Sequence, residues 1–218
     1  MKAAPGNRAA TAAHRWAKGG RWLCWITAMV LAWRGLEVCD AVDGLHEVPY
    51  QGEAWSTEDG LPGNTITSLW QTRDGFLWIG TFNGLARFDG VRFTVFRQED
   101  HPEMTSERIL CLTEDRTGAL WIGTEGGGLL RYAEGAFSNL TTADGLSHNI
   151  VRTVYEDTHG RLWVGTLSGM NRVVDGRVER HPGGARGFPG EDINGLGTDA
   201  KGNLWVAGPR WVGILGAG

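Results

Sequence analysis

Residues 74–81 read Asp-Gly-Phe-Leu-Trp-Ile-Gly-Thr, and the chain repeats this stretch three more times. The copies are 117–124 (Thr-Gly-Ala-Leu-Trp-Ile-Gly-Thr), 159–166 (His-Gly-Arg-Leu-Trp-Val-Gly-Thr) and the more divergent 201–208 (Lys-Gly-Asn-Leu-Trp-Val-Ala-Gly). Their tryptophans are 43, 42 and 42 residues apart. A fixed period of this length is typical of solenoids, propellers and other repeat proteins, so we expect one structural unit per copy.

Each copy carries the signals of several short strands. A run rich in β-branched and apolar residues precedes each stretch, at 66–71, 109–114, 151–156 and 193–198, and such runs are typical of strands. A glycine three residues before each tryptophan can take the positive φ that a tight hairpin requires. In the first three copies two more runs follow, separated by Asp-Gly, Glu-Gly and Asp-Gly. Four antiparallel strands every ~42 residues predict one propeller blade.

We therefore expect an all-β fold, a partial β-propeller of about four four-stranded antiparallel blades. The blades would span about 53–98, 99–140, 141–182 and 183–218. Residues 52–57 align with the outer strand of a blade, whereas the fourth copy shows three strands at most. The N-terminal strand could complete that blade and close a ring of four, but we expect an open arc of a larger ring. An open arc would expose apolar blade faces at both ends.

Two residue types recur in register within the predicted blades. A tryptophan at one position of every second strand can fill the space between neighbouring blades. This predicts that the repeated tryptophans are core residues, namely Trp78, Trp121, Trp163 and Trp205. Arginine recurs in the third strand as Arg87, Arg131 and Arg172, and a shared structural contact is the expected reason.

Residues 1–41 differ from the rest of the chain. Basic residues precede an apolar run at 22–33, which at ~1.5 Å per residue reaches ~18 Å and is shorter than a ~30 Å hydrocarbon core. This order predicts a secretory signal peptide, with Ala41 as a candidate cleavage point. An uncleaved membrane anchor and a buried helix are the alternatives. We expect export to the periplasm or to the extracytoplasmic side of the membrane, with membrane contact only through this segment.

Composition excludes several classes of function. The formal net charge is −4 and no basic block follows residue 41, which argues against nucleic acid as a partner. Cys111 is the only cysteine after residue 41, so we expect a buried small hydrophobe rather than a disulfide or a metal cluster. The histidines are scattered, so no metal site and no cofactor are expected.

Three segments together resemble the two-component regulator propeller family. They are 55–64 (Trp-Ser-Thr-Glu-Asp-Gly-Leu-Pro-Gly-Asn), 71–81 and 84–90, and the Asp-Gly-Leu element returns at 144–146. The resemblance covers residues 53 to about 215. It implies seven-bladed propellers, often in tandem, outside the cytoplasmic membrane. In that family they precede a small β-sandwich, a transmembrane helix and an output module, usually a histidine kinase and sometimes a diguanylate cyclase.

The resemblance implies that this chain is the ligand-sensing input domain of a two-component sensor. The chain shows four repeats and no kinase region, so we expect no enzyme activity from it alone. Kinase or cyclase activity would lie in a missing C-terminal region. The alternatives are the input domain of a diguanylate cyclase, a non-catalytic protein-binding scaffold or an inactive fragment. In a full-length protein the partners would be the output domain or a second copy in a homodimer.

The candidate binding residues lie in loops that gather on one face of a propeller, before the first strand and between the second and third strands of each blade. Polar groups there, with one aromatic ring nearby, could bind a small polar ligand such as a saccharide. The candidates are Asn64, Phe82, Asn83, Glu107, Glu125, His148, Asn149 and Glu191. The alternative is that each polar side chain only satisfies its own turn. No catalytic residue is expected.

Overall fold

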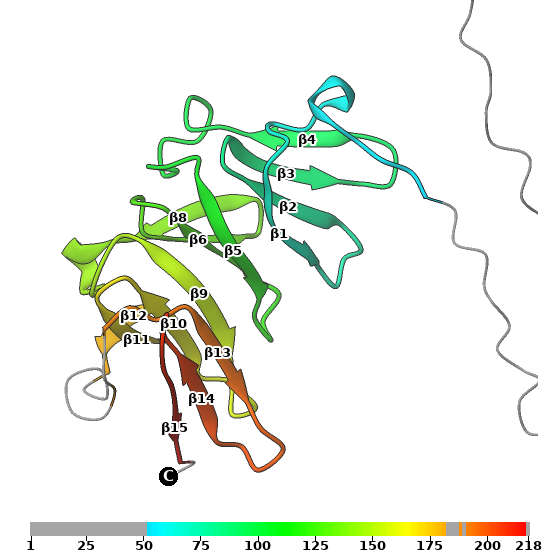
Figure 1. Cartoon of the computed structure of the whole chain (residues 1–218). Helices are drawn as coiled ribbons and strands as arrows, with labels where there is room; N and C mark the ends of the chain where they lie inside the picture. Colours follow the sequence, from blue (N-terminus) through cyan, green and yellow to red (C-terminus); the bar gives the residue numbers. More distant parts are fainter. Residues whose placement is uncertain (1–51, 182–187, 189–190, 217–218) are drawn as a thin grey trace, which may run out of the picture. The chain divides into compact units, whose positions relative to one another are not determined.

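Antiparallel strands make up nearly all the regular structure in the computed structural model of the chain (Figure 1). The structure describes residues 52–181, 188 and 191–216. The predicted signal peptide or anchor at 1–41 lies outside the described residues. Within the described ranges, no helix has the length and apolar character that a membrane crossing requires.

Four separate sheets follow one another along the chain, and each takes its strands in chain order. Blade 1 contains β1 (Ile66–Gln71), β2 (Leu77–Thr81), β3 (Gly84–Phe88) and β4 (Phe93–Phe96). Blade 2 contains β5 (Ile109–Glu114), β6 (Leu120–Thr124), β7 (Leu129–Ala133) and β8 (Ala136–Leu140). Blade 3 contains β9 (Val151–Glu156), β10 (Leu162–Thr166), β11 (Gly169–Val174) and β12 (Arg177–Arg180). Blade 4 contains β13 (Gly195–Thr198), β14 (Leu204–Ala207) and β15 (Val212–Leu215).

The all-β propeller prediction is confirmed, and the blades form an open arrangement rather than a closed ring. Two details of the strand prediction were wrong. Residues 52–56 belong to no strand, and Thr57–Asp59 forms the short 3₁₀ turn η1. The three-stranded sheet of blade 4 leaves one edge of β15 unpaired, and residues 52–56 do not pair with that edge. The first strand of blade 4 begins at Gly195 rather than at residue 193.

The β1–β2 hairpin and its counterparts each turn at a glycine. Positive φ values of 94°, 88°, 79° and 83° occur at the glycine of each turn, which are Gly75, Gly118, Gly160 and Gly202. An L-residue with a side chain is strained in this region of φ. The predicted glycine turns are therefore confirmed in all four copies.

Neighbouring blades pack face to face, with their first strands side by side. The second-strand tryptophan of a blade packs toward the next blade, so that Trp78 belongs to one cluster with Ile109 and Leu112 of blade 2. The glycine two residues later makes room for this contact. A Cβ at Gly80 would lie 2.7 Å from Ile109 Cγ2, and a Cβ at Gly165 would lie 2.6 Å from Ile193 Cγ2. The recurring Trp-Ile/Val-Gly pattern thus records how closely each following blade approaches.

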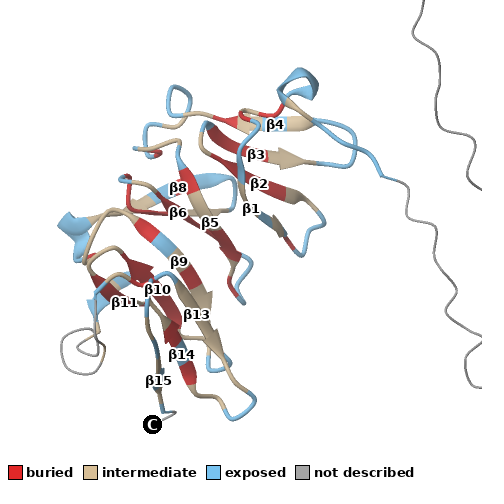
Figure 2. Ribbon diagram, viewed as in Figure 1, coloured by how far each residue is buried: buried red, intermediate tan, exposed pale blue. Residues whose placement is uncertain are grey.

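The tryptophan prediction holds for three copies and fails for the fourth. Trp78, Trp121 and Trp163 are 2–4% exposed, whereas Trp205 is 43% exposed. Trp205 faces the side of blade 4 on which the described residues place no further blade, and the glycine of the pattern is Ala207 there. At the other end, Ile66 and Leu69 of β1 are exposed although their counterparts in blade 2, Ile109 and Leu112, are buried. Figure 2 shows the buried positions concentrated in the central strands of the blades.

Candidate functional site

A carboxylate six residues before the tryptophan organises the hairpin turn in three of the four blades. Asp115 Oδ2 accepts a hydrogen bond from Trp121 Nε1 at 2.7 Å. Its Oδ1 accepts hydrogen bonds from the backbone N–H groups of Thr117 (2.8 Å) and Ala119 (3.1 Å). The same indole bond measures 2.9 Å in blade 3 and 3.1 Å in blade 4, for the pairs Asp157–Trp163 and Asp199–Trp205. In blade 1 the acceptor is the hydroxyl of Thr72, at 3.1 Å from Trp78 Nε1.

These carboxylates are held in their charged form by the turn. Burial raises the pKa of Asp115, but hydrogen bonds from Thr117, Trp121 and Ala119 outweigh it and leave the pKa below its ordinary value. Burial and hydrogen bonds act in the same way on the pKa of Asp157. For Asp199 the hydrogen bond from the Asn203 side chain leads, and the pKa falls to about 2. A carboxylate with a lowered pKa and donors on both oxygens is a turn element, not a general acid.

The predicted binding face is present as a set of loop ends. We call it the inner-loop face: the segments that enter β1, β5, β9 and β13, together with the β2–β3, β6–β7 and β10–β11 turns. It lies at the opposite end of each second strand from the hairpin turns just described. The eight candidate residues all lie in these segments.

Two of the three candidate asparagines satisfy their own turns. Asn64 Oδ1 accepts the Thr57 backbone N–H at 3.0 Å, and Asn149 Oδ1 accepts the Thr142 backbone N–H at 2.8 Å. Both bonds close the same kind of loop, because each 3₁₀ turn begins with a capping box. The side chains of Asn64 and Asn149 thus satisfy their own turns, which was the alternative to ligand binding.

Three further candidates also make local contacts. His148 Nδ1 accepts the Ile150 backbone N–H at 2.9 Å, and Glu107 Oε1 accepts the Gln98 backbone N–H at 3.1 Å. The backbone N–H of Asn83 donates to the hydroxyl of Thr81 in the same turn, and Asn83 is exposed. Glu191 is exposed at the entry to blade 4.

The remaining two candidates, Phe82 and Glu125, come together through a residue that was not predicted. Arg108 Cζ lies 4.4 Å from the centroid of the Phe82 ring. The Arg108 guanidinium also forms an ion pair with Glu125. The side chains of Arg108 and Glu125 are 51% and 39% exposed. We call these three residues the Phe82–Arg108–Glu125 cluster, and it joins blades 1 and 2 on the inner-loop face.

A second ion pair joins blades 3 and 4 at the same end of the strands. Arg152 Nε lies 2.8 Å from Asp192 Oδ1. Sequence reasoning missed Arg108, Arg152 and Asp192 because the residues at the entry to each blade do not recur. The position thirteen residues before each repeated tryptophan holds Thr65, Arg108, Ile150 and Asp192. The available signal was charge at a loop end that the propeller prediction already placed on this face.

Cys111 and the recurring arginines take structural roles. The thiol lies beside the hydrophobic cluster of blades 2 and 3, and burial raises the pKa of Cys111 to about 12. Arg87 and Arg131 lie over the tryptophans of their own blades, at 5.7 and 5.8 Å from the ring centroid. Arg172 instead pairs with Glu179 at 2.7 Å. Among the described residues no group of three or more His, Cys, Asp or Glu side chains could hold a metal ion.

The fold and the repeated turns define a β-propeller repeat protein. The family model "Two component regulator propeller" matches residues 60–83, 103–126 and 145–168, which are the loop entry, first strand and second strand of blades 1 to 3. The resemblance inferred from the sequence is thus confirmed over these three segments of the chain.

Proteins similar to this chain include a histidine kinase and extracellular domains of putative hybrid two component systems. Histidine kinase P4 of Formosa agariphila is 30% identical over 132 residues, which are 56% of this chain and 10% of that protein. Two solved extracellular domains of putative hybrid two component systems from B. thetaiotaomicron are also similar. One has a TM-score of 0.67 at 24% identity, over 75% of this chain and 25% of that chain. The other has a TM-score of 0.60 at 29% identity, over 73% and 24%.

The chain therefore spans a tenth of the curated relative and about a quarter of the two solved chains. What these comparisons establish is a propeller segment of the kind found in two-component sensor systems.

Proposed function

We propose that the chain is the extracytoplasmic sensing part of a two-component signalling protein, and that it binds a small polar ligand such as a saccharide on the inner-loop face. The observation that carries the ligand proposal is the Phe82–Arg108–Glu125 cluster. It offers an aromatic ring, a guanidinium and a carboxylate on half-exposed side chains from two blades. Hydroxyl groups of a saccharide can accept from the arginine and donate to the glutamate, while a sugar ring can rest on the phenyl ring.

The position of the cluster suits a sensor. Glu125 lies in the β6–β7 turn and forms a bridge with Ile150, the residue that enters blade 3. Its backbone N–H also donates to the Arg108 carbonyl oxygen at 2.8 Å. A ligand that contacts Phe82, Arg108 and Glu125 would therefore touch the entry to two successive blades. Such a ligand could favour one relative placement of those blades over another.

A binding screen tests the ligand proposal. Calorimetric titration of the purified chain with a panel of neutral and acidic mono- and oligosaccharides should find at least one that binds. Arg108→Ala should weaken that binding at least tenfold. Arg73→Ala is the matched control, because Arg73 is also an exposed inter-blade arginine but lies on a hairpin turn at the other end of the strands. Binding that survives Arg108→Ala, or a panel without any binder, would contradict the proposal.

Export and signalling are tested separately. Alkaline phosphatase fused after Gly218 is active only outside the cytoplasm, so an active fusion that becomes inactive without residues 1–41 supports the proposed location. The reading frame that follows Gly218 in the gene distinguishes a histidine kinase output from a diguanylate cyclase output. A frame with neither would leave the protein-binding scaffold as the better proposal.

A further inference from the structure

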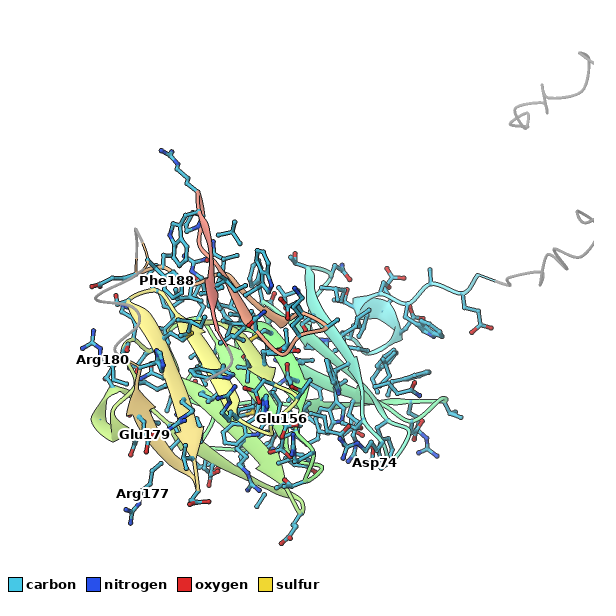
Figure 3. The ribbon with its side chains drawn as sticks, turned by 90° about the horizontal axis from the view of Figure 1, so that it is seen from below. Asp74, Glu156, Arg177, Glu179, Arg180 and Phe188 are labelled. Atoms are coloured by element: carbon cyan, nitrogen blue, oxygen red, sulfur yellow. The ribbon has the colours of Figure 1, made fainter. Side chains whose placement is uncertain are left out.

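A cavity of about 480 Å³ lies between blades 2 and 3, at the hairpin end of the strands. Its walls come from β6–β8 of blade 2 and from blade 3, with Trp121, Arg131, Leu140, Glu156, Leu162 and Val173 among the lining residues. The volume falls within the range of small-molecule sites, ~300–1,000 Å³. Figure 3 labels Glu156 at this end of the blades, together with Asp74 of the first hairpin turn.

The equivalent space between blades 1 and 2 is filled by aromatic rings. Trp78 packs on Phe96 (5.3 Å between centroids) and on Tyr132 (5.0 Å), and Phe137 lies 5.6 Å from Phe96. Arg87 stacks on a further ring, that of Phe76, at 4.3 Å. Five aromatic side chains and one arginine thus occupy this interface.

Strand register shows what replaces those rings between blades 2 and 3. Tyr132 pairs with Leu120 in blade 2, and the counterpart pair in blade 3 is Val173 with Leu162. The large ring of Tyr132 is therefore replaced by a valine side chain at the next interface.

By the same comparison, Leu140 of blade 2 takes the place of Phe96 of blade 1. Phe96 pairs with Leu85 and Leu140 pairs with Leu129, and each of these leucines is the first in the third strand of its blade. Phe76 and Phe137 likewise become Ala119 and Val178. Since protein interiors are close-packed, replacing four rings with aliphatic side chains leaves space unless the blades move together. They cannot move much closer, because a Cβ at Gly123 would already lie only 2.8 Å from the Val151 carbonyl oxygen at the inner strands.

One cation in the cavity wall has no charged or hydrogen-bonding partner. Arg131 lies over Trp121 but makes no hydrogen bond or ion pair with any residue in the described ranges. Three carboxylates line the cavity with it: Asp175 is exposed in the β11–β12 turn, and the other two are already engaged. Asp115 accepts from the Trp121 indole, and Glu156 accepts from the side chain and backbone N–H of Arg116 at 2.8 and 2.7 Å.

The cavity therefore combines aliphatic side chains, an indole and a single available guanidinium, with the exposed carboxylate of Asp175 in the neighbouring turn. Arginine binds carboxylates through two parallel hydrogen bonds, and such charge-assisted bonds are stronger than neutral ones. A ligand for this site needs a carboxylate for Arg131 and a compact apolar body for Leu140, Val173 and Trp121.

We propose that the space between blades 2 and 3 is a binding site for a small carboxylate whose ring packs against these aliphatic residues. The site lies at the opposite end of the strands from the Phe82–Arg108–Glu125 cluster, because its rim includes the turn residues Thr117, Gly160 and Gly176. Binding at this site can therefore be tested independently of the saccharide site.

Benzoate is a suitable probe, and benzamide is its uncharged control with the same ring. Benzoate has few non-hydrogen atoms, so a Kd of about 1–10 mM is expected at ordinary ligand efficiency. In ¹⁵N-labelled protein the Trp121 indole N–H, assigned by its loss in Trp121→Phe, should shift and saturate with benzoate. Benzamide should bind at least tenfold more weakly.

Two kinds of variant separate the charge from the space. Arg131→Met should weaken benzoate binding at least tenfold, while Arg87→Met, the same change in the filled interface, should leave it unchanged. Val173→Tyr restores the ring found at Tyr132 and should abolish binding.

Leu140→Phe, which restores the ring of Phe96, gives the same test if Val173→Tyr loses its dispersed spectrum. The proposal is overturned if benzoate produces no saturable shift, if benzamide binds equally well, or if the filled variants still bind.

Discussion

Replacing two tryptophans at the same register of different blades should give very different losses of stability. Trp121 and Trp205 occupy equivalent positions of β6 and β14, and each donates its indole N–H to an aspartate six residues earlier. Trp121 is 4% exposed and Trp205 is 43% exposed. The local sequence and the hydrogen bond are matched, so the comparison isolates the contribution of the next blade.

The expected difference follows from the buried area. A fully buried tryptophan removes up to ~250 Å² from water. The two exposed fractions, 4% and 43%, therefore correspond to buried areas that differ by about 100 Å². At ~25 cal/mol/Å² this amounts to about 2.5 kcal/mol, an upper value because unfolded chains already bury part of their surface. Trp121→Ala should therefore lower the free energy of unfolding by about 3–5 kcal/mol, and Trp205→Ala by about 1–2 kcal/mol.

Urea unfolding followed by far-ultraviolet circular dichroism measures both losses from the shift in midpoint at a common slope. Trp163→Ala is the control, because Trp163 packs against blade 4 and is also 4% exposed. Its loss should match that of Trp121→Ala. The measurement is repeated at two protein concentrations, since association of the open faces would cover Trp205. Losses for Trp205→Ala and Trp121→Ala that agree within about 0.5 kcal/mol at both concentrations would refute the packing of tryptophan against the following blade.

Three further outcomes are expected. The folded pKa of Asp115 lies below its unfolded value. The contribution of this carboxylate to stability is therefore present above about pH 4 and is lost as the pH falls through the folded pKa. Asp115→Asn should lower the melting temperature at pH 7 and should reduce the further drop in melting temperature on acidification to pH 3. Gly165→Ala places a Cβ 2.6 Å from Ile193 Cγ2 and should lower the free energy of unfolding by about 1–3 kcal/mol. Ala207→Gly changes the same register of blade 4 and should cost less than about 1 kcal/mol in the same urea assay. Burial raises the pKa of Cys111 to about 12. In a variant with the other two cysteines replaced by serine, a disulfide reagent at pH 8 should label the native chain far more slowly than the urea-unfolded chain. Equal labelling rates would contradict the burial of Cys111.

Much of the fold could be predicted because its signals are local. The spacing of the tryptophans, the glycine in each hairpin turn and the runs of β-branched residues all lie within one repeat of ~42 residues. These signals placed the second strand of every blade at its observed residues. The position of the candidate binding loops followed from the same repeat, since strand order alone brings those loop ends together.

The contacts of the candidate binding residues were harder to predict because their partners lie in other loops. Asn64 and Asn149 were candidates as polar loop residues, yet each satisfies a turn that begins seven residues earlier. Phe82 and Glu125 lie 43 residues apart in sequence and meet only through Arg108. Contacts of this kind depend on how one blade is placed on the next, and no periodic signal records that.

By itself the sequence determined that this protein is built from a tandem β unit with a tryptophan at its centre, because turn chemistry and residue spacing act over a few residues. Only the tertiary structure decided that Trp205 is half-exposed while Trp121 is buried, and that the space between blades 2 and 3 stays open around Arg131. The physical reason is that burial and cavity volume are properties of two facing blades, whose contacting side chains lie about one repeat apart in the chain.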